Sequence, residues 1–155
     1  MCIRDRYNII IQVYRLGIGI IALWQPKAKA WIAGRKNLFP HIQQTFKEAP
    51  NQIVWFHCAS LGEYEQGQPV MERVKEAQPD QKIVLTFFSP SGYEARSHFK
   101  GADYVYYLPL DTKKNATELV QLLQPKYVFF VKYEFWYHHL SVSYTHLTLP
   151  TILLV

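Results

Sequence analysis

The chain has 155 residues, 49% of them apolar and 15% aromatic, and this length and composition suit one domain with a packed core. Its formal net charge of +5 at pH 7 suits an anionic partner such as a phosphate or a membrane surface. The basic residues cluster beside one apolar segment and form no long stripe, so we expect no nucleic-acid partner. Outside the first six residues Cys58 is the only cysteine, which excludes an internal disulfide and fits a reducing cytosol.

Both ends of the chain resemble translated sequencing adaptor. The DNA string ATGTGTATAAGAGACAG plus one base encodes residues 1–6, and its reverse complement, read in another frame, encodes residues 142–146. We therefore expect residues 1–6 and 141–155 to be sequencing-adaptor artefacts and leave them out of the fold prediction. On this interpretation the apolar tail, residues 147–155, forms neither a strand nor a membrane anchor.

Residues 7–36 combine an apolar segment with a basic flank. The apolar part, YNIIIQVYRLGIGIIALW, is interrupted by polar residues and is borderline in length for a bilayer-spanning helix. Trp24 and Trp31 suit a membrane interface, and four basic residues follow closely: Lys27, Lys29, Arg35 and Lys36. We interpret this region as a membrane-associated helix that lies in or dips into the bilayer. The alternative is a core helix of a soluble domain.

The rest of the chain alternates between two periodicities. Residues 37–51 read as a connector with a possible short helix. Strands are then predicted at 52–58, 81–88, 104–107 and 126–131, and helices at 63–77, 91–99 and 112–123. Asp111 is the expected cap of the last of these helices. The alternation predicts an α/β fold, a Rossmann-like parallel sheet with flanking helices.

Polar and small residues follow three of the predicted strands, where an α/β sheet holds its ligands. We expect one site assembled from three loops. Its candidate residues are Ser60, Gly62 and Glu63 after the first strand, Ser89, Ser91 and Gly92 after the second, and Glu134 after the fourth.

Each candidate also has a purely structural interpretation. Glu63 is either a general base or the second half of a capping box begun by Ser60. Gly62 and Gly92 either let a phosphate approach the backbone or serve turns only, and Ser91 also fits a capping box. Glu134 either binds polar groups of a substrate or is a structural carboxylate, with Lys132 as its local partner. The residues alone leave these alternatives open.

Other chemistries are poorly supported. His57 and Cys58 are adjacent on a strand and point to opposite faces, and no zinc-type spacing occurs, so we expect no metal. No glycine-rich phosphate loop or nucleophile elbow is present, so we expect neither a nucleotide site of that kind nor a hydrolase triad.

Four stretches make the chain recognisable: residues 59–63 (ASLGE), 86–92 (TFFSPSG), 107–111 (YLPLD) and 133–136 (YEFW). In order and spacing they resemble the N-terminal half of the bacterial 3-deoxy-D-manno-octulosonic acid (Kdo) transferases, glycosyltransferases that add Kdo to the lipid A precursor. The resemblance covers residues 7–140. This chain departs from the family in small ways: Leu61 stands where Val is commoner, and Ser89 and Ser91 stand where Thr is usual.

The resemblance implies a two-domain GT-B fold, in which residues 37–140 form the N-terminal acceptor-binding domain and the C-terminal donor domain is missing. It implies an inverting, metal-independent transfer from CMP-Kdo that needs no cofactor, with Glu63 as general base. The remaining six candidates would bind the acceptor. The helix at residues 7–36 would hold the enzyme on the cytoplasmic face of the bacterial inner membrane.

Two other functions are compatible with the residues. One is a GT-B glycosyltransferase that uses a different nucleotide sugar, because donor choice is not encoded in these residues. The other is a non-enzymatic, flavodoxin-like binding module in which Glu63 is only a helix cap.

Overall fold

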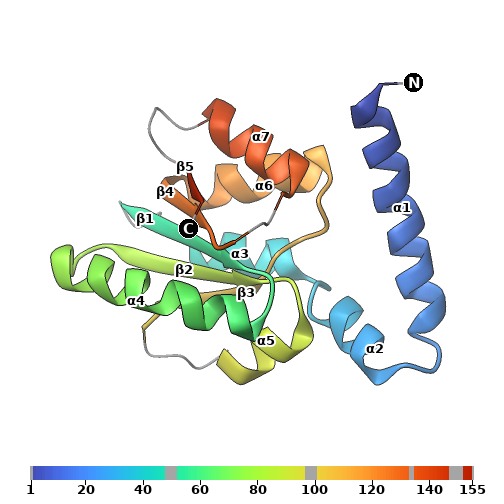
Figure 1. Ribbon diagram of the computed structural model, residues 1–155, viewed down its shortest axis with the longest axis horizontal. Coiled ribbons are helices and arrows are strands. Elements are labelled where there is room, and N and C mark those ends of the chain that lie inside the picture. The colour runs from blue at the N-terminus through green and yellow to red at the C-terminus, as the bar shows by residue number, and fades with distance from the viewer. Residues whose placement is uncertain (1, 48–51, 97–100, 133–134, 147–151, 155) are drawn as a thin grey trace.

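The computed structural model describes residues 2–47, 52–96, 101–132, 135–146 and 152–154 (Figure 1). In chain order the helices and strands are α1 (Ile3–Ile21), α2 (Pro26–Ala33), α3 (Leu38–Thr45), β1 (Ile53–Cys58), α4 (Leu61–Ala77), β2 (Lys82–Phe87), α5 (Pro90–Arg96), β3 (Tyr104–Tyr107), α6 (Lys113–Leu123), β4 (Pro125–Phe130), α7 (Tyr137–His146) and β5 (Ile152–Leu154).

The described strands form one sheet in the order β3-β2-β1-β4-β5, and every neighbouring pair is parallel. β1 lies in the middle of the sheet, and all six of its residues are buried. A strand covered on both faces needs apolar side chains on both, which explains the almost unbroken apolar sequence of β1. The predicted α/β fold with a parallel sheet is confirmed.

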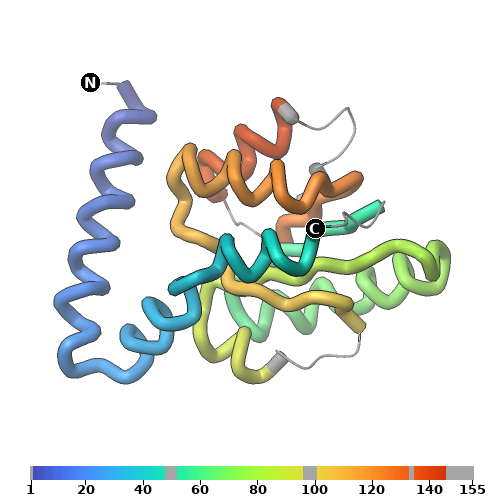
Figure 2. The backbone as a smooth tube through the Cα atoms, turned by 180° about the vertical axis from the view of Figure 1, so that it is seen from behind, coloured from blue at the N-terminus to red at the C-terminus, as the bar shows by residue number. Residues whose placement is uncertain are grey.

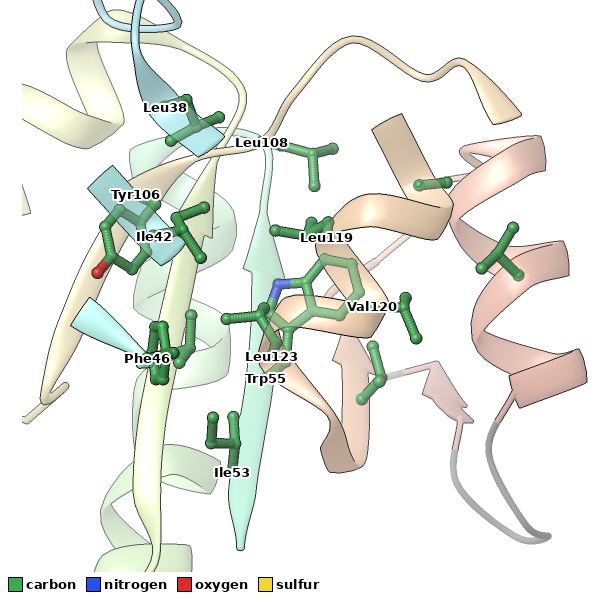
Figure 3. Close-up of a cluster of buried hydrophobic side chains, with 14 of the residues drawn as sticks. Leu38, Ile42, Phe46, Ile53, Trp55, Tyr106, Leu108, Leu119, Val120 and Leu123 are labelled. Carbon is green, nitrogen blue, oxygen red and sulfur yellow. The ribbon is translucent and has the colours of Figure 1, made fainter. Parts of the chain in front are cut away.

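Helices cover both faces of this sheet (Figures 1 and 2). On one face α3, α6 and α7 enclose a cluster in which Trp55 of β1 lies against Leu119 and Leu123 of α6 (Figure 3). On the other face α4 packs Tyr64 and Met71 against the alternate residues of β1 and β2. The two clusters together form the core, and they hold the strand ends rigidly.

The predicted elements between residues 52 and 131 are all present. Their boundaries differ from the prediction by at most two residues, except that the predicted end of the 91–99 helix lies outside the described residues. The possible short helix in the 37–51 connector is present as α3. The prediction for the tail was wrong, because Ile152–Leu154 forms β5 and pairs with β4. An open edge of a sheet offers unpaired backbone groups to any apolar extended segment, which explains this pairing. That the ends derive from adaptor stays a prediction.

Helix α1 stands beside the sheet and covers neither of its faces (Figures 1 and 2). Ile11 is its one buried residue, and it packs with Trp31 of α2 and with Leu110, which follows β3. The Tyr14 ring also contacts the Trp31 ring, at 5.9 Å between centroids. No helix in the described part of the chain is long and apolar enough to cross a bilayer. A core helix is also ruled out, since most of the surface of α1 is exposed.

Asp111 joins three elements, and it does not cap α6 as predicted. Thr112 is the N-cap of α6, and its hydroxyl accepts a hydrogen bond from the Asn115 backbone N–H at 3.2 Å. The buried Asp111 carboxylate instead accepts from the backbone N–H groups of His138 and His139, at 3.0 and 2.9 Å. These amides belong to the first turn of α7, where a carboxylate is most favourable.

The same carboxylate accepts a hydrogen bond from the Tyr7 hydroxyl of α1. Burial and the neighbouring Asp111 charge raise the pKa of Tyr7, so its hydroxyl stays a donor. His138 Nε2 lies 2.7 Å from Asn8 Oδ1 on the next residue of α1. Asp111 therefore ties α1 and the start of α7 to the loop after β3.

His139 is a fully buried, neutral histidine. Its Nε2 lies 3.2 Å from the Pro109 carbonyl oxygen, which it reaches as a donor, and 3.7 Å from Asp111 Oδ1. Burial lowers the pKa of His139 to about 4, although the Asp111 charge opposes this. An ion pair with Asp111 would require a protonated ring, so at neutral pH the contact is a neutral one.

This lowered pKa makes stability depend on pH. Between pH 6.5 and 4 the unfolded chain binds a proton at His139 that the folded chain does not. The free energy of unfolding should therefore fall by up to about 3 kcal/mol as pH decreases through that window. Urea unfolding at several pH values measures this decrease in the free energy of unfolding. The control is His139→Gln, which cannot bind this proton. An equal pH slope in this variant and the parent chain would contradict the assignment.

Candidate functional site

The order of the strands reverses at β1, and this reversal marks one end of the sheet as the candidate site. From β1 the chain proceeds outward to β2 and β3, and then returns to β4 on the opposite side of β1. In open α/β sheets, ligands bind outside the carboxyl ends of the strands at such a reversal. The loops that follow β1, β2 and β4 all lie at this end, and these are the three loops that carry the predicted site residues.

Glu63 lies in the first turn of α4, directly after β1. Its Oε2 accepts a hydrogen bond from the Ser60 backbone N–H at 2.9 Å, which is the half of the predicted capping box in which the carboxylate bonds the cap residue. Its other carboxylate oxygen has no partner among the described residues. The side chain is half-buried. One oxygen therefore holds the carboxylate in place while the other is available to a ligand.

The loop after β2 lies against the loop after β1. The Ser89 backbone N–H donates to the Ala59 carbonyl oxygen at 2.9 Å, which brings Ser89 beside the residues that precede Glu63. Ser89 Oγ accepts from the Gly92 N–H at 3.2 Å and lies 3.3 Å from Ser91 Oγ. Ser89 thus caps α5, with Pro90 as the first helical residue. The prediction that Ser91 begins a capping box was wrong, and its exposed hydroxyl faces solvent.

The two candidate glycines differ in what surrounds them. A Cβ added to Gly92 would lie 2.6 Å from a carbon of the Phe87 ring, so packing alone requires a glycine there. A Cβ added to Gly62 would meet nothing within 4 Å. Neither has a positive φ. Gly62 is therefore the glycine that the fold does not need, and it leaves open space next to Glu63.

The loop after β4 is described in part. Glu134 and the residue before it lie outside the described residues, so its role stays a prediction. On the near side, Val131 N–H donates to the His57 carbonyl oxygen at 3.0 Å, and Lys132 has a left-handed backbone with φ of 64°. On the far side, the Trp136 ring lies 4.6 Å from the Phe88 ring. The three loops therefore meet at the carboxyl end of the sheet.

The predicted position of Arg35 was wrong. It was assigned to a lipid-facing basic flank, but its guanidinium points inward and donates to the Leu108 and Phe88 carbonyl oxygens, both at 2.8 Å, and to the Trp31 carbonyl at 3.0 Å. It also lies 3.8 Å over the Trp31 ring. Burial lowers the pKa of Arg35 to about 9. Arg35 thereby ties α2 to the segments that follow β2 and β3.

The possible metal ligands are dispersed. Among the described residues, no three His, Cys, Asp or Glu side chains gather in one place. His57 lies against Thr86 and Phe130, whereas Cys58 belongs to the cluster on the other face of the sheet. The groups available at the carboxyl end are therefore a carboxylate with an unbonded oxygen, serine hydroxyls and an open backbone, a set that can take a proton from a hydroxyl group.

The family model and three similar proteins that match this chain have the same description. The family described as 3-deoxy-D-manno-octulosonic-acid transferase (kdotransferase) matches residues 34–154. A protein of Haemophilus influenzae named 3-deoxy-D-manno-octulosonic acid transferase is 27% identical over 120 residues, which cover 77% of this chain and 27% of the relative.

Proteins with the same name from other bacteria are also similar. The one from Chlamydia trachomatis serovar D is 34% identical over 66% of this chain and 24% of its own length. The one from Aquifex aeolicus is 33% identical over 65% of this chain and 27% of its own length. The chain thus spans about a quarter of the length of these relatives. It belongs to the 3-deoxy-D-manno-octulosonic acid transferase family.

Proposed function

We propose that this chain is the acceptor-binding N-terminal domain of a glycosyltransferase of lipopolysaccharide biosynthesis, which moves Kdo from CMP-Kdo to the lipid A precursor. Its membership of the Kdo transferase family supports the reaction class. The observation that carries the proposal is the position of Glu63, at the strand-order reversal, with one oxygen held and the other free. The donor is bound by a second domain, as in a GT-B enzyme, so the 155-residue chain alone is inactive.

In the proposed mechanism Glu63 removes the proton from an acceptor hydroxyl. The hydroxyl oxygen then forms a bond to the anomeric carbon of Kdo as the bond from that carbon to CMP breaks, with inversion and without a metal. The Ser60 N–H keeps the Glu63 carboxylate oriented, which is what a general base requires. The reaction balances, since the proton remains on Glu63 and CMP leaves with the electron pair.

The other candidates bind the acceptor in this proposal. Gly62 provides room for the sugar beside the base, and Ser91 offers an exposed hydroxyl for a hydrogen bond. Ser89 and Gly92 shape the loop, because the hydroxyl of one bonds the amide of the other. Ser60 and Glu134 complete the set from the loops after β1 and β4.

We also propose that α1 rests on the cytoplasmic face of the inner membrane. Tyr7, Ile11 and Tyr14 face the domain. The opposite side of α1 exposes apolar residues at helical spacing, Ile9, Val13, Leu16 and Ile20, each more than half accessible, and Trp24 in the turn after α1 is similarly exposed. A helix with one docked face and one apolar outer face lies in the plane of a lipid surface and does not cross it.

The general base is tested by Glu63→Gln in the complete gene product, with the donor domain present. The amide oxygen of Gln still accepts from the Ser60 N–H, so folding is expected to be unchanged. Transfer of Kdo, followed by the mass of the product, should fall at least a hundredfold because general-base catalysis contributes about that much or more. Glu65→Gln, an exposed carboxylate on the same helix, is the matched control. Near-normal transfer by the Glu63 variant would favour the capping role alone. Inactivity of the wild type with CMP-Kdo would favour another nucleotide sugar.

The two glycines make a second test. Gly62→Ala should leave the free energy of unfolding unchanged or slightly higher, because Ala is the better helix former and the added methyl meets nothing. It should nevertheless raise KM for the acceptor, since the methyl occupies the space beside Glu63. Gly92→Ala should lower stability through the clash with Phe87. Unchanged kinetics in Gly62→Ala would show that no substrate approaches that position.

The membrane contact is tested with neutral phosphatidylcholine vesicles and the double variant Leu16→Gln/Ile20→Gln. Both side chains are exposed, so the fold should be retained, as circular dichroism can verify. Removing two apolar contacts should weaken vesicle binding at least tenfold in a flotation assay. Equal binding of variant and parent would contradict an apolar contact through this face.

A further inference from the structure

A cavity with strongly basic walls lies between α1, α2 and the start of α6. Its volume is about 640 Å³, a size typical of a small-molecule site. Four cationic side chains line it, from α1, from the turn after α2 and from α6: Arg15, Arg35, Lys36 and Lys114. None of the residues that line it is acidic. These cations come together through the fold, because Lys114 is far from the others in sequence.

None of these four cations forms an ion pair with a carboxylate of the described residues. Arg35 is the most constrained of them, because it is half-buried and its guanidinium bonds only to carbonyl oxygens. Those three bonds use three of its five N–H donors. Burial holds its pKa at about 9, which shows that the surroundings disfavour the charge. A partly buried cation without a counter-ion gains most from an anion placed beside it.

Trp31, another residue of the wall, also has an unused donor. The residue is buried, and its indole Nε1–H has no hydrogen-bond acceptor in the described part of the protein. Buried donors of this kind normally have a partner. The Nε1 atom itself is not accessible, so the preference for an acceptor-rich anion comes from the cations that line the cavity.

We propose that this cavity binds the phosphate-bearing headgroup of a membrane lipid. Guanidinium and ammonium groups are the side chains that best hold phosphate oxygens. The position of α1 favours a lipid. This helix provides Arg15 and Gly19 to the cavity and carries the exposed apolar row on its outer side. When that row lies in a lipid surface, the cavity opens at the depth of the headgroups. The inference rests on the membrane contact proposed above and not on Kdo transfer.

Two lipids carry the required chemistry: the phosphorylated acceptor itself and an anionic phospholipid of the bilayer. The first would make the cavity a binding subsite for the substrate, and the second would make it an anchor that orients the enzyme. Phe88 connects the two regions, since its ring lies 5.7 Å from Trp31 in the cavity wall and it directly precedes Ser89 of the candidate site.

The test compares two double variants of the complete gene product. Arg15→Gln/Lys114→Gln removes two exposed charges that line the cavity. Lys27→Gln/Lys29→Gln removes two exposed charges from the neighbouring helix α2 that do not line it. Vesicles of phosphatidylcholine, with and without one-fifth phosphatidylglycerol, separate the apolar contact of α1 from the effect of anionic headgroups. KM for the acceptor in neutral detergent micelles separates the acceptor from bulk phospholipid.

If a phospholipid headgroup occupies the cavity, Arg15→Gln/Lys114→Gln should weaken binding to the anionic vesicles by about 30-fold. The α2 control should weaken it clearly less, and binding to neutral vesicles should be unchanged in both. If the acceptor phosphate occupies it, the cavity variant should raise KM in micelles and the control should not. Equal effects of the two variants in both assays would show diffuse attraction without a site and would overturn the proposal. Absent binding to neutral vesicles would instead refute the membrane contact of α1.

Discussion

The parallel pairing of β1 with β2 on one side and β4 on the other is the constraint on which the rest of this structure depends. It buries β1 on both faces and brings the carboxyl ends of three strands to one edge of the sheet. The loops that follow those strands therefore lie next to one another. The backbone bonds from Ser89 to Ala59 and from Val131 to His57 extend the sheet pairing into these loops.

Two buried polar side chains fasten the remaining elements to that edge. Arg35 bonds carbonyl oxygens that follow β2 and β3, and Asp111 bonds the first turn of α7 and the Tyr7 hydroxyl of α1. Such groups are favourable only when their hydrogen bonds are complete, since an unpaired buried charge costs several kcal/mol. Asp111 is fully engaged, whereas Arg35 retains unused donors beside a basic cavity. That difference supports the proposal that Arg35 helps to bind an anion.

The position of Glu63 is compatible with both a structural contact and the proposed catalytic role. A carboxylate in the first turn of a helix is stabilised by the free amides there, so Glu63 does not destabilise the fold at this position. The same contact restricts the rotamers of Glu63 and engages only one of its two oxygens. The capping and general-base interpretations are therefore compatible, and kinetics, not geometry, distinguishes them.

Local sequence was sufficient for the elements and for the candidate residues at the strand ends. Hydrophobic periodicity and small residues after apolar runs located β1 to β4, α4 and α6 to within two residues, because those signals act over a few neighbouring positions. Local sequence was not sufficient to predict hydrogen bonds between residues that are far apart in the chain. Asp111 has Thr112 as its neighbour but bonds residues 138, 139 and 7, and Arg35 follows a basic run but points into the protein.

The same division applies to the whole molecule. The sequence by itself determined the α/β class, the parallel sheet and the family, since these depend on the order and periodicity of short segments. Only the tertiary structure decided which oxygen of Glu63 is free, which glycine is needed for packing, and which cations share a cavity. These properties depend on distances between residues far apart in the chain, and such distances exist only once the sheet has assembled and the helices have packed against it.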